Sequence, residues 1–280
     1  MQVWKTINAA REAIRIGGAS LRPLALVPTM GALHEGHLAL VREARSRCAA
    51  VIVSVFVNPT QFSPGEDFSR YPRPFERDCE LLEGESVFAV FAPDPGEIYD
   101  ADAATIVRVA GLTDHLCGPF RPGHFDGVAT IVTKLFNILS PDAAFFGEKD
   151  FQQLQVVRRV VRDLNLPIEI IPCPTVRDAD GVALSSRNAY LTPPQRVQAR
   201  SLSAALFSAK DRITRGESDV SALISDMRQK ILDAGPAEIE YIEIVDPDTL
   251  KPVSRADRPV RIALAVRIGA CRLIDNVPAP

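Results

Sequence analysis

The sequence from Leu24 to Leu38 predicts a strand, a tight loop and the start of a helix, and only a few folds contain such a unit. A short apolar run precedes the segment PTMGALHEGHL, which holds Gly31 and Gly36, and a helical pattern with one apolar face follows it. A strand that passes through a glycine-bearing loop into a helix is typical of α/β proteins. The first N–H groups of such a helix lack helical partners and lie at its positive dipole end, so the unit also predicts a phosphate site.

Two histidines three residues apart, His34 and His37, lie at this helix start. Side chains at this spacing share one helix face, so both rings can point at the same bound anion. An imidazole donates a hydrogen bond or carries positive charge, and both stabilise charge that develops on a phosphoryl group. Two other interpretations stay open: a glycine turn needed only for tight geometry, and a zinc site built on HEGH. The zinc interpretation is the weaker, because the zincin pattern H-E-x-x-H is one residue longer.

Strand and helix patterns alternate along residues 1–176. The run AAVIVSVFV over Ala49–Val57 is typical of a parallel strand buried on both faces. Such alternation predicts a doubly wound parallel sheet with right-handed crossovers. The first fifteen residues form an amphipathic pattern that predicts a helix. Further strands are expected over Leu24–Val27, Val87–Ala92, Ala143–Phe146 and Ile168–Ile171, and helices over Val128–Leu139 and Phe151–Leu164.

The pattern changes after the turn formed by residues 178–181. Two long helices are expected over Pro193–Arg215 and Asp219–Ala234, followed by alternating strands over Ile239–Val245 and Val260–Ile268. Helices followed by strands predict a smaller α+β domain. We therefore expect an α/β fold with two domains, residues 1–176 and 177–280.

Composition and charge narrow the class of protein. A formal net charge of −3 without a long basic run disfavours nucleic acid as the main partner. The five cysteines are scattered singly, which favours reduced thiols in the cytoplasm. No run approaches the roughly 20 apolar residues that a membrane span needs. We expect a cytoplasmic enzyme without a membrane partner.

Three further polar clusters follow predicted strands or the domain boundary. Gln61 comes after the strand over Ala49–Val57, Lys149 and Asp150 after that over Ala143–Phe146, and the third cluster is Ser185–Arg187. Each has a plain structural alternative, such as a polar loop or, for Asp150, a helix N-cap. Hydroxyls, a guanidinium and an ammonium also bind phosphate. Together with the histidine segment, the clusters predict a ligand site at the carboxyl edge of the sheet.

Several segments resemble one enzyme family in order along the chain. PTMGALHEGHL resembles the HIGH motif of the nucleotidyltransferase superfamily, and ALSSRN resembles its KMSKS counterpart. NPTQF, RPGHFDGV, FGEKDFQQL and the terminal RLIDN are similar to segments of the pantoate–β-alanine ligase family. The resemblance runs from Val27 to Asn276, and the joint presence of these motifs is specific to the family.

The resemblance implies a reaction with two steps. ATP, accompanied by Mg²⁺, adenylates the carboxylate of (R)-pantoate and releases pyrophosphate, and the amine of β-alanine then displaces AMP to give pantothenate. The resemblance also implies a homodimer, with a Rossmann-type N-terminal domain that holds the site beneath a C-terminal lid. The metal ligands stay unknown, with Asp78 and Asp150 as weak candidates.

The same resemblance implies the site residues. Gln61 would contact both pantoate and β-alanine, and Gln153 would contact pantoate. The catalytic residues would be His34, His37, Lys149, Ser185, Ser186 and Arg187. The ATP-binding residues would be Met30, Gly31, Ala32, Leu33, His34, Glu35, Gly36, His37, Gly147, Glu148, Lys149, Asp150, Val176, Leu184, Ser185, Ser186 and Arg187.

Rival functions differ in what they would need. Another HIGH-type adenylyltransferase would pass AMP to a phosphate acceptor, whereas the glutamine-bearing segments favour a carboxylate acceptor and an amine. An aminoacyl-tRNA synthetase would need a surface that binds tRNA, which this mildly acidic chain does not show. A nucleotide sensor would not need the full set of donors, and a zinc hydrolase would need the HEGH site to bind metal.

Overall fold

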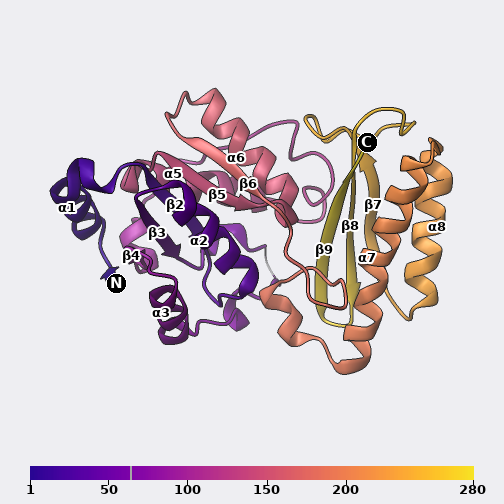
Figure 1. Cartoon of the computed structure of the whole chain (residues 1–280), viewed down its shortest axis with the longest axis horizontal. Helices are drawn as coiled ribbons and strands as arrows, with labels where there is room; N and C mark the ends of the chain where they lie inside the picture. Colours follow the sequence, from indigo (N-terminus) through magenta and orange to yellow (C-terminus); the bar gives the residue numbers. More distant parts are fainter. Residues whose placement is uncertain (64) are drawn as a thin grey trace. The chain divides into compact units, whose positions relative to one another are not determined.

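The computed structural model describes residues 1–63 and 65–280, which form two compact units (Figure 1). Unit 1 comprises Met1–Val109, Arg121–Glu148 and Gln153–Pro174. Unit 2 comprises Ala110–Phe120, Lys149–Gln152 and Thr175–Pro280. The predicted fold class is confirmed, because unit 1 holds a six-stranded parallel sheet with helices and unit 2 a smaller antiparallel sheet with helices.

The parallel sheet of unit 1 has the order β1-β4-β3-β2-β5-β6. The strands are β1 (Gln2–Trp4), β2 (Leu24–Thr29), β3 (Ala50–Val55), β4 (Ala89–Phe91), β5 (Ala143–Gly147) and β6 (Glu169–Cys173). From β2 the chain adds β3 and β4 on one side, and later β5 and β6 on the other. The switch point therefore lies between β2 and β5, and sheets of this kind bind ligands outside the carboxyl ends of the strands at that point.

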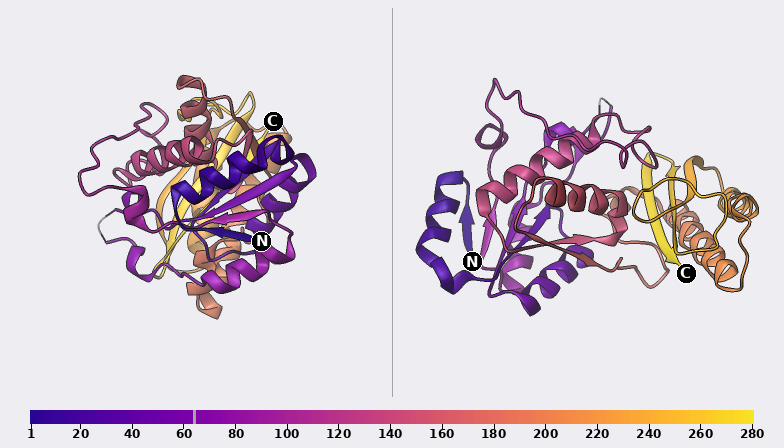
Figure 2. Two further views of the ribbon diagram at one scale, coloured as in Figure 1. Left: turned by 90° about the vertical axis from the view of Figure 1, so that its left-hand side faces the viewer. Right: turned by 90° about the horizontal axis from the view of Figure 1, so that it is seen from above.

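Helices cover both faces of this sheet, with α2 and α3 on one face and α5 and α6 on the other (Figure 2). The helices of this part of the chain are α1 (Ile7–Gly17), α2 (Glu35–Arg47), α3 (Phe75–Gly84), α4 (Pro95–Ile98), α5 (His124–Leu139) and α6 (Phe151–Asp163). On the first face, Leu38 and Val41 of α2 pack with Val27, Val53 and Phe145 of the sheet in one buried cluster. The central strands are thus buried on both sides, which explains their nearly continuous apolar sequences.

Several elements differ from the sequence prediction, which also lacks the short helix α4. The first fifteen residues are not one helix: Gln2–Trp4 forms an edge strand parallel to β4, and α1 begins only at Ile7. The helix starts there because Thr6 is its N-cap, with its hydroxyl accepting from the Ala9 N–H at 3.2 Å. Helix α3 and the last strand, β9 (Cys271–Ala279), were not expected, and Asp275 and Asn276 interrupt the apolar pattern of that strand.

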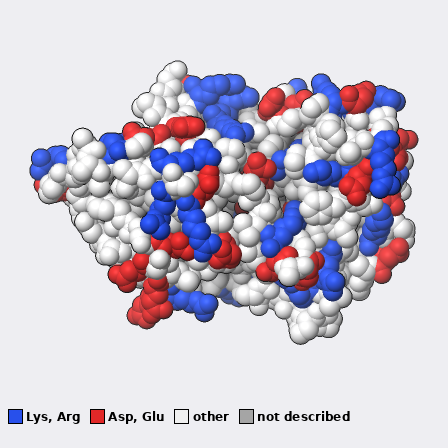
Figure 3. Space-filling view, in the orientation of Figure 1, with Lys and Arg blue, Asp and Glu red and all other residues white. Residues whose placement is uncertain are grey.

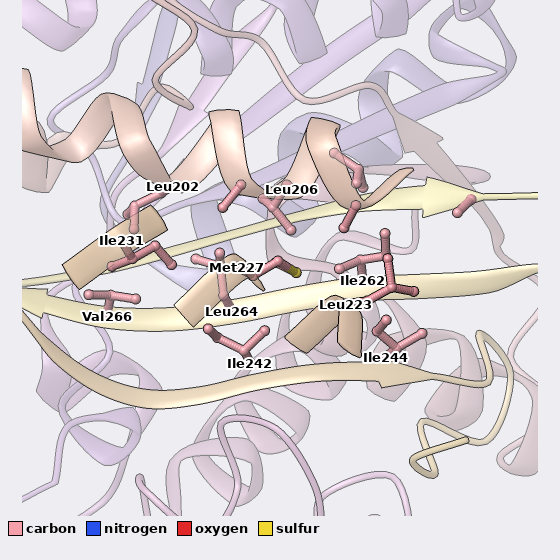
Figure 4. Close-up of a cluster of buried hydrophobic side chains, with 14 of the residues drawn as sticks. Leu202, Leu206, Leu223, Met227, Ile231, Ile242, Ile244, Ile262, Leu264 and Val266 are labelled. Atoms are coloured by element: carbon pink, nitrogen blue, oxygen red, sulfur yellow. The ribbon is translucent and has the colours of Figure 1, made fainter. Parts of the chain in front are cut away.

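Unit 2 is built on the antiparallel sheet β7-β8-β9, in which β7 is Glu238–Val245 and β8 is Val260–Ile268. Its long helices are α7 (Pro193–Thr214) and α8 (Val220–Asp233). Figure 4 shows side chains of both helices meeting those of β7 and β8, with Met227 and Leu264 among them. This core accounts for the helical and strand patterns of the C-terminal part of the sequence.

Two short segments that precede residue 176 also belong to unit 2, namely Ala110–Phe120 and Lys149–Gln152. They do so because polar side chains of β7–β9 bind them, as Tyr241 binds Cys117 and Asn276 binds Lys149. Such tertiary contacts leave no periodic pattern in the sequence. The domains expected at residues 1–176 and 177–280 stay a prediction, because compact packing alone does not define parts that fold or move separately.

Figure 3 shows Lys and Arg side chains interspersed with Asp and Glu over the face that it displays. Interspersed charges of both signs keep the local potential small. In the described part of the chain, no helix combines the length and the apolar character that crossing a bilayer requires.

Candidate active site

The loop after β2 turns sharply because two successive residues adopt left-handed backbone angles, Gly31 with φ +77° and Ala32 with φ +51°. A Cβ on Gly31 would lie 2.9 Å from Asp78 Oδ2 and 3.0 Å from Val55 Cγ1, so the position admits only glycine without rearrangement. Ala32 pays roughly 1 kcal/mol for its conformation. The surrounding contacts must therefore hold this turn in place.

Asp78 of α3 supplies those contacts. Its Oδ2 accepts from the Ala32 N–H at 2.9 Å, and its Oδ1 accepts from the Leu33 N–H at 2.8 Å. The side chain is almost fully buried, and burial raises the pKa of Asp78 although the two N–H donors act to lower it. Because both carboxylate oxygens already bind the loop, Asp78 does not fit the weak sequence assignment as a Mg²⁺ ligand.

The two histidines at the start of α2 cap the helix and each other. His34 is the N-cap residue, and its Nδ1 accepts from the Gly36 N–H at 3.2 Å. In return, His37 Nδ1 accepts from the His34 N–H at 3.4 Å, and the two ring centroids lie 4.1 Å apart. Because each Nδ1 is an acceptor, the proton of each neutral ring lies on Nε2.

This arrangement changes one detail of the sequence interpretation. One of the first N–H groups of the helix, that of Gly36, is bound by His34. The capping contacts hold the two histidine rings side by side, with each Nδ1 turned to the helix start.

Gln61 lies in the short helical turn Pro59–Gln61 that follows β3, and it is buried. Its Oε1 accepts from Asn58 Nδ2 at 3.2 Å, which turns the NH₂ group toward Met30 Sδ, 2.9 Å away. Asn58 is held in turn by the Tyr99 hydroxyl, which donates to Asn58 Oδ1 at 2.8 Å. The structure thus brings Gln61 next to Met30 and orients its amide.

A chain of four groups also fixes the main chain at Gln61. Glu66 accepts two hydrogen bonds of 2.7 Å from Arg121, whose Nη1 lies 2.9 Å from His124 Nε2. An arginine only donates, so His124 Nε2 is the acceptor. His124 Nδ1 therefore carries the proton and donates to the Gln61 carbonyl at 2.8 Å. This series of hydrogen bonds requires a neutral imidazole at His124.

The β5 segment supplies Gly147 and Glu148 to unit 1, at the strand end beside β2 across the switch point. Gln153 lies in the first turns of α6 and is half-buried. In unit 2, Lys149 Nζ lies 3.8 Å from Asp150 Oδ2, and the lysine side chain is largely covered while that of Asp150 is half-exposed. Asp150 is therefore the more accessible carboxylate of the two sequence candidates.

The remaining predicted residues form a hairpin in unit 2. The Leu184 N–H donates to the Val176 carbonyl at 3.0 Å, so these two residues lie side by side. Ser185 starts the short turn Ser186–Tyr190 and accepts from the Arg187 N–H at 3.3 Å through Oγ. Asn188 Nδ2 binds the Ala183 carbonyl at 2.9 Å and closes the base of the turn.

The predicted residues thus fall into two groups, one in unit 1 and one in unit 2. Sequence reasoning assigned no positioning role to Asp78, Asn58, Arg121 or His124. The last three lie within NPTQF and RPGHFDGV, so the motifs themselves were a signal, whereas Asp78 had none beyond its place near a helix start. Across residues 1–63 and 65–280, no cluster of three or more His, Cys, Asp or Glu side chains is placed to hold a metal ion.

Comparison with known proteins identifies the family. The sequence model described as pantoate-beta-alanine ligase matches residues 2–278. The pantothenate synthetase of Moorella thermoacetica is 54% identical over 277 residues, covering 99% of this chain and 98% of its own. That of Thermotoga petrophila is 49% identical over 276 residues, covering 99% of each chain.

Solved structures agree with the sequence relatives. The pantothenate synthetase of Thermus thermophilus superposes with a TM-score of 0.93 at 45% identity, covering 99% of each chain. The pantoate-beta-alanine ligase of Francisella tularensis, a complex with beta-gamma ATP and beta-alanine, superposes with a TM-score of 0.83 at 34% identity, covering 99% of this chain and 97% of its own. Sequence and fold therefore agree over nearly the whole length, and the chain belongs to the pantoate–β-alanine ligase family.

Proposed function

We propose that this ligase forms a pantoyl-adenylate, and that the paired histidines, Lys149 and the Ser185–Arg187 turn stabilise its formation. The observation that carries the proposal is the fixed pair His34 and His37, whose Nδ1 atoms are bound by the helix start so that both rings keep a proton on Nε2. They follow β2, beside the switch point of the sheet. Two preset donors at such a place suit a reaction that builds negative charge on phosphate oxygens.

In the first step, a carboxylate oxygen of pantoate attacks the α-phosphorus of ATP, and the bond from that phosphorus to the bridging oxygen breaks. Charge develops on the equatorial oxygens and on the departing pyrophosphate. The histidine Nε2–H groups, with Lys149 and the Ser185–Arg187 turn, are the proposed donors to these oxygens. Little covalent work is left to the protein, so positioning and charge stabilisation govern the rate.

In the second step, the β-alanine amine attacks the acyl carbon, and the bond from that carbon to the AMP oxygen breaks. Gln61 is proposed to hold both pantoate and β-alanine, and Gln153 to hold pantoate. The NH₂ group of Gln61 is set by Asn58, and it is neutral. A neutral donor holds the pantoate carboxylate without the loss of nucleophilicity that a bidentate arginine would cause.

Magnesium is proposed to enter with ATP, where it would neutralise charge on the phosphates during pyrophosphate departure. Magnesium sites of this kind use one or two carboxylates, substrate phosphates and water. The half-exposed carboxylate of Asp150 fits such a role. Asp78 does not, because the two oxygens of Asp78 accept from the Ala32 and Leu33 N–H groups. The homodimer implied by the resemblance and the cytoplasmic location expected from the scattered cysteines also belong to this proposal, and light scattering of the purified protein tests the dimer.

Oxygen transfer from the acceptor tests the adenylate directly. With pantoate labelled by ¹⁸O in its carboxylate, the proposed route places one ¹⁸O atom in AMP and leaves one in the amide product. Mass spectrometry of both products gives the result. Unlabelled AMP in a complete reaction would refute the acyl-adenylate, and AMP retained on a phosphate acceptor would favour the rival adenylyltransferase.

A further inference from the structure

The terminal segment RLIDN, Arg272–Asn276, has no part in the reaction described so far, although it places two polar side chains in the middle of β9. Asp275 and Asn276 are 4% and 5% exposed, and Arg261 of the neighbouring β8 is 5% exposed. Buried polar groups cost free energy unless each of them is bound. Their partners therefore show what the strand does.

Asn276 joins β8 and β9 to the turn that holds Lys149. Arg261 Nε donates to Asn276 Oδ1 at 2.6 Å, and Asn276 Nδ2 donates to the Lys149 carbonyl at 2.8 Å. Because arginine only donates and a carbonyl only accepts, the amide of Asn276 fits in one orientation. It is a directional link between the strand and the lysine main chain.

The same turn is held at two more points. The Arg261 guanidinium carbon lies 4.0 Å from the centroid of the Phe151 ring, at the start of α6. Gln152 Nε2 donates to the carbonyls of Leu112 and His115, and its Oε1 accepts from the Cys117 N–H. The turn is thus held at Lys149, Phe151 and Gln152.

Asp275, the neighbour of Asn276, binds the second predicted segment of unit 2. Its two oxygens accept from Arg177 Nη1 and Nη2 at 2.6 and 2.8 Å. Arg177 follows Val176 in the hairpin that leads to Ser185–Arg187. One pair of residues in β9 therefore holds both the lysine turn and the hairpin.

We propose that Asn276, together with Arg261, is a positioning residue for Lys149 during adenylation. Two apolar residues in place of Arg261 and Asn276 would pack in the sheet at no greater free-energy cost. They would not hold the main chain of Lys149 at a fixed distance from β9. A misplacement of about 1 Å costs up to roughly 10²-fold in rate. This inference rests on the role in phosphate binding that is proposed above for Lys149.

The test is a double-mutant cycle on pantoate-dependent exchange of pyrophosphate into ATP. Asn276→Asp keeps the side-chain volume and an acceptor for Arg261, but it places an oxygen against the Lys149 carbonyl. We expect this variant to lower kcat for exchange roughly 10-fold, with a smaller change in KM for pantoate. In a Lys149→Gln background, which itself loses on the order of 10²-fold, Asn276→Asp should change the rate by less than about twofold. Asn137→Asp, the same substitution on an exposed helix surface, is the control and should match the native rate.

The outcomes separate the two proposals. Full additivity of Lys149→Gln and Asn276→Asp overturns the positioning role and leaves the function of Lys149 in place. An unchanged rate in Lys149→Gln overturns that function and the positioning role with it. If Asn276→Asp does not fold, as judged by circular dichroism, Arg261→Lys enters the same cycle, because it keeps the charge and loses the fixed Nε contact. Coupling in that cycle supports the proposal, and additivity overturns it.

Discussion

Replacing Asp78 by asparagine tests whether one buried carboxylate orders the histidine loop. The native side chain, 1% exposed, accepts two hydrogen bonds of 2.9 and 2.8 Å from the Ala32 and Leu33 N–H groups. Asparagine has nearly the same volume but only one acceptor oxygen, and its NH₂ group would face the second N–H. An unpaired buried N–H costs about 1–3 kcal/mol, and the remaining bond loses its charge. The carboxylate's own burial penalty is removed, so a net loss of about 2 kcal/mol is expected.

Hydrogen–deuterium exchange of the peptide that covers residues 30–38 measures this loss locally. Since about 1.4 kcal/mol corresponds to a factor of ten, the Asp78→Asn loop should exchange roughly 30-fold faster than the native loop. Pantoate-dependent pyrophosphate exchange should fall as well, because His34 follows the braced residues directly. Asp163→Asn, an exposed change at the end of α6, should leave both measurements within about twofold. Native protection of residues 30–38 in Asp78→Asn would refute the bracing role.

The difference in unfolding free energy between the native protein and Asp78→Asn depends on pH with a defined sign. Burial raises the pKa of Asp78 above its usual 3.8, so the native state binds this proton more readily than the unfolded state. Its contribution to stability is full below the unfolded pKa and declines as the pH rises through the folded pKa. The native protein should therefore exceed Asp78→Asn in unfolding free energy by more at pH 3 than at pH 7.

The other predictions concern the reacting groups and the support of Gln61. His37→Ala should lower kcat by about 10²–10³ while KM for ATP changes little, and a rise in KM alone would make His37 a binding residue. Gln61→Arg should still bind pantoate but form the adenylate more slowly, and an unchanged or faster single-turnover rate would contradict the argument for a neutral donor. Burial alone would raise the pKa of Glu66, but the hydrogen bonds and the charge of Arg121 lower it by more. The pKa of Glu66 therefore lies below its usual 4.5. The pair stabilises the fold above pH 4.5 and loses its effect as the pH falls through the lowered pKa, so urea unfolding of Glu66→Gln and of the native protein should converge in acid.

The sequence predicted the elements that carry strong periodicity. The continuous run at Ala49–Val57 and the strand–loop–helix unit at Leu24–Leu38 gave β3, β2 and α2 nearly as they occur. It could not predict β1, whose three residues are too few to show a period, or β9, whose Asp275 and Asn276 replace apolar side chains. Those two residues are polar because they bind Arg177 and Lys149, contacts that no local pattern records.

In the site, too, local sequence patterns could be read, whereas contacts between distant residues could not. Motif resemblance pointed to the histidine segment, the glutamines and the Ser185–Arg187 turn, and side-chain hydrogen bonds order the histidine segment, Gln61 and the turn. The supporting roles of Asp78 and Asn276 could not be predicted from the sequence. Asp78 binds a loop that lies 46 residues earlier in the chain, and Asn276 binds a carbonyl 127 residues away. A buried carboxylate on two N–H groups looks, in sequence, like any acidic residue near a helix start.

Exchange of labelled pyrophosphate into ATP, first without and then with β-alanine, tests whether the enzyme adenylates pantoate before the amine reacts. We expect exchange that requires pantoate alone, and formation of AMP and an amide in equal amounts once β-alanine is added. Absence of exchange with pantoate, in folded protein shown to bind ATP, would contradict the proposed pantoyl-adenylate step.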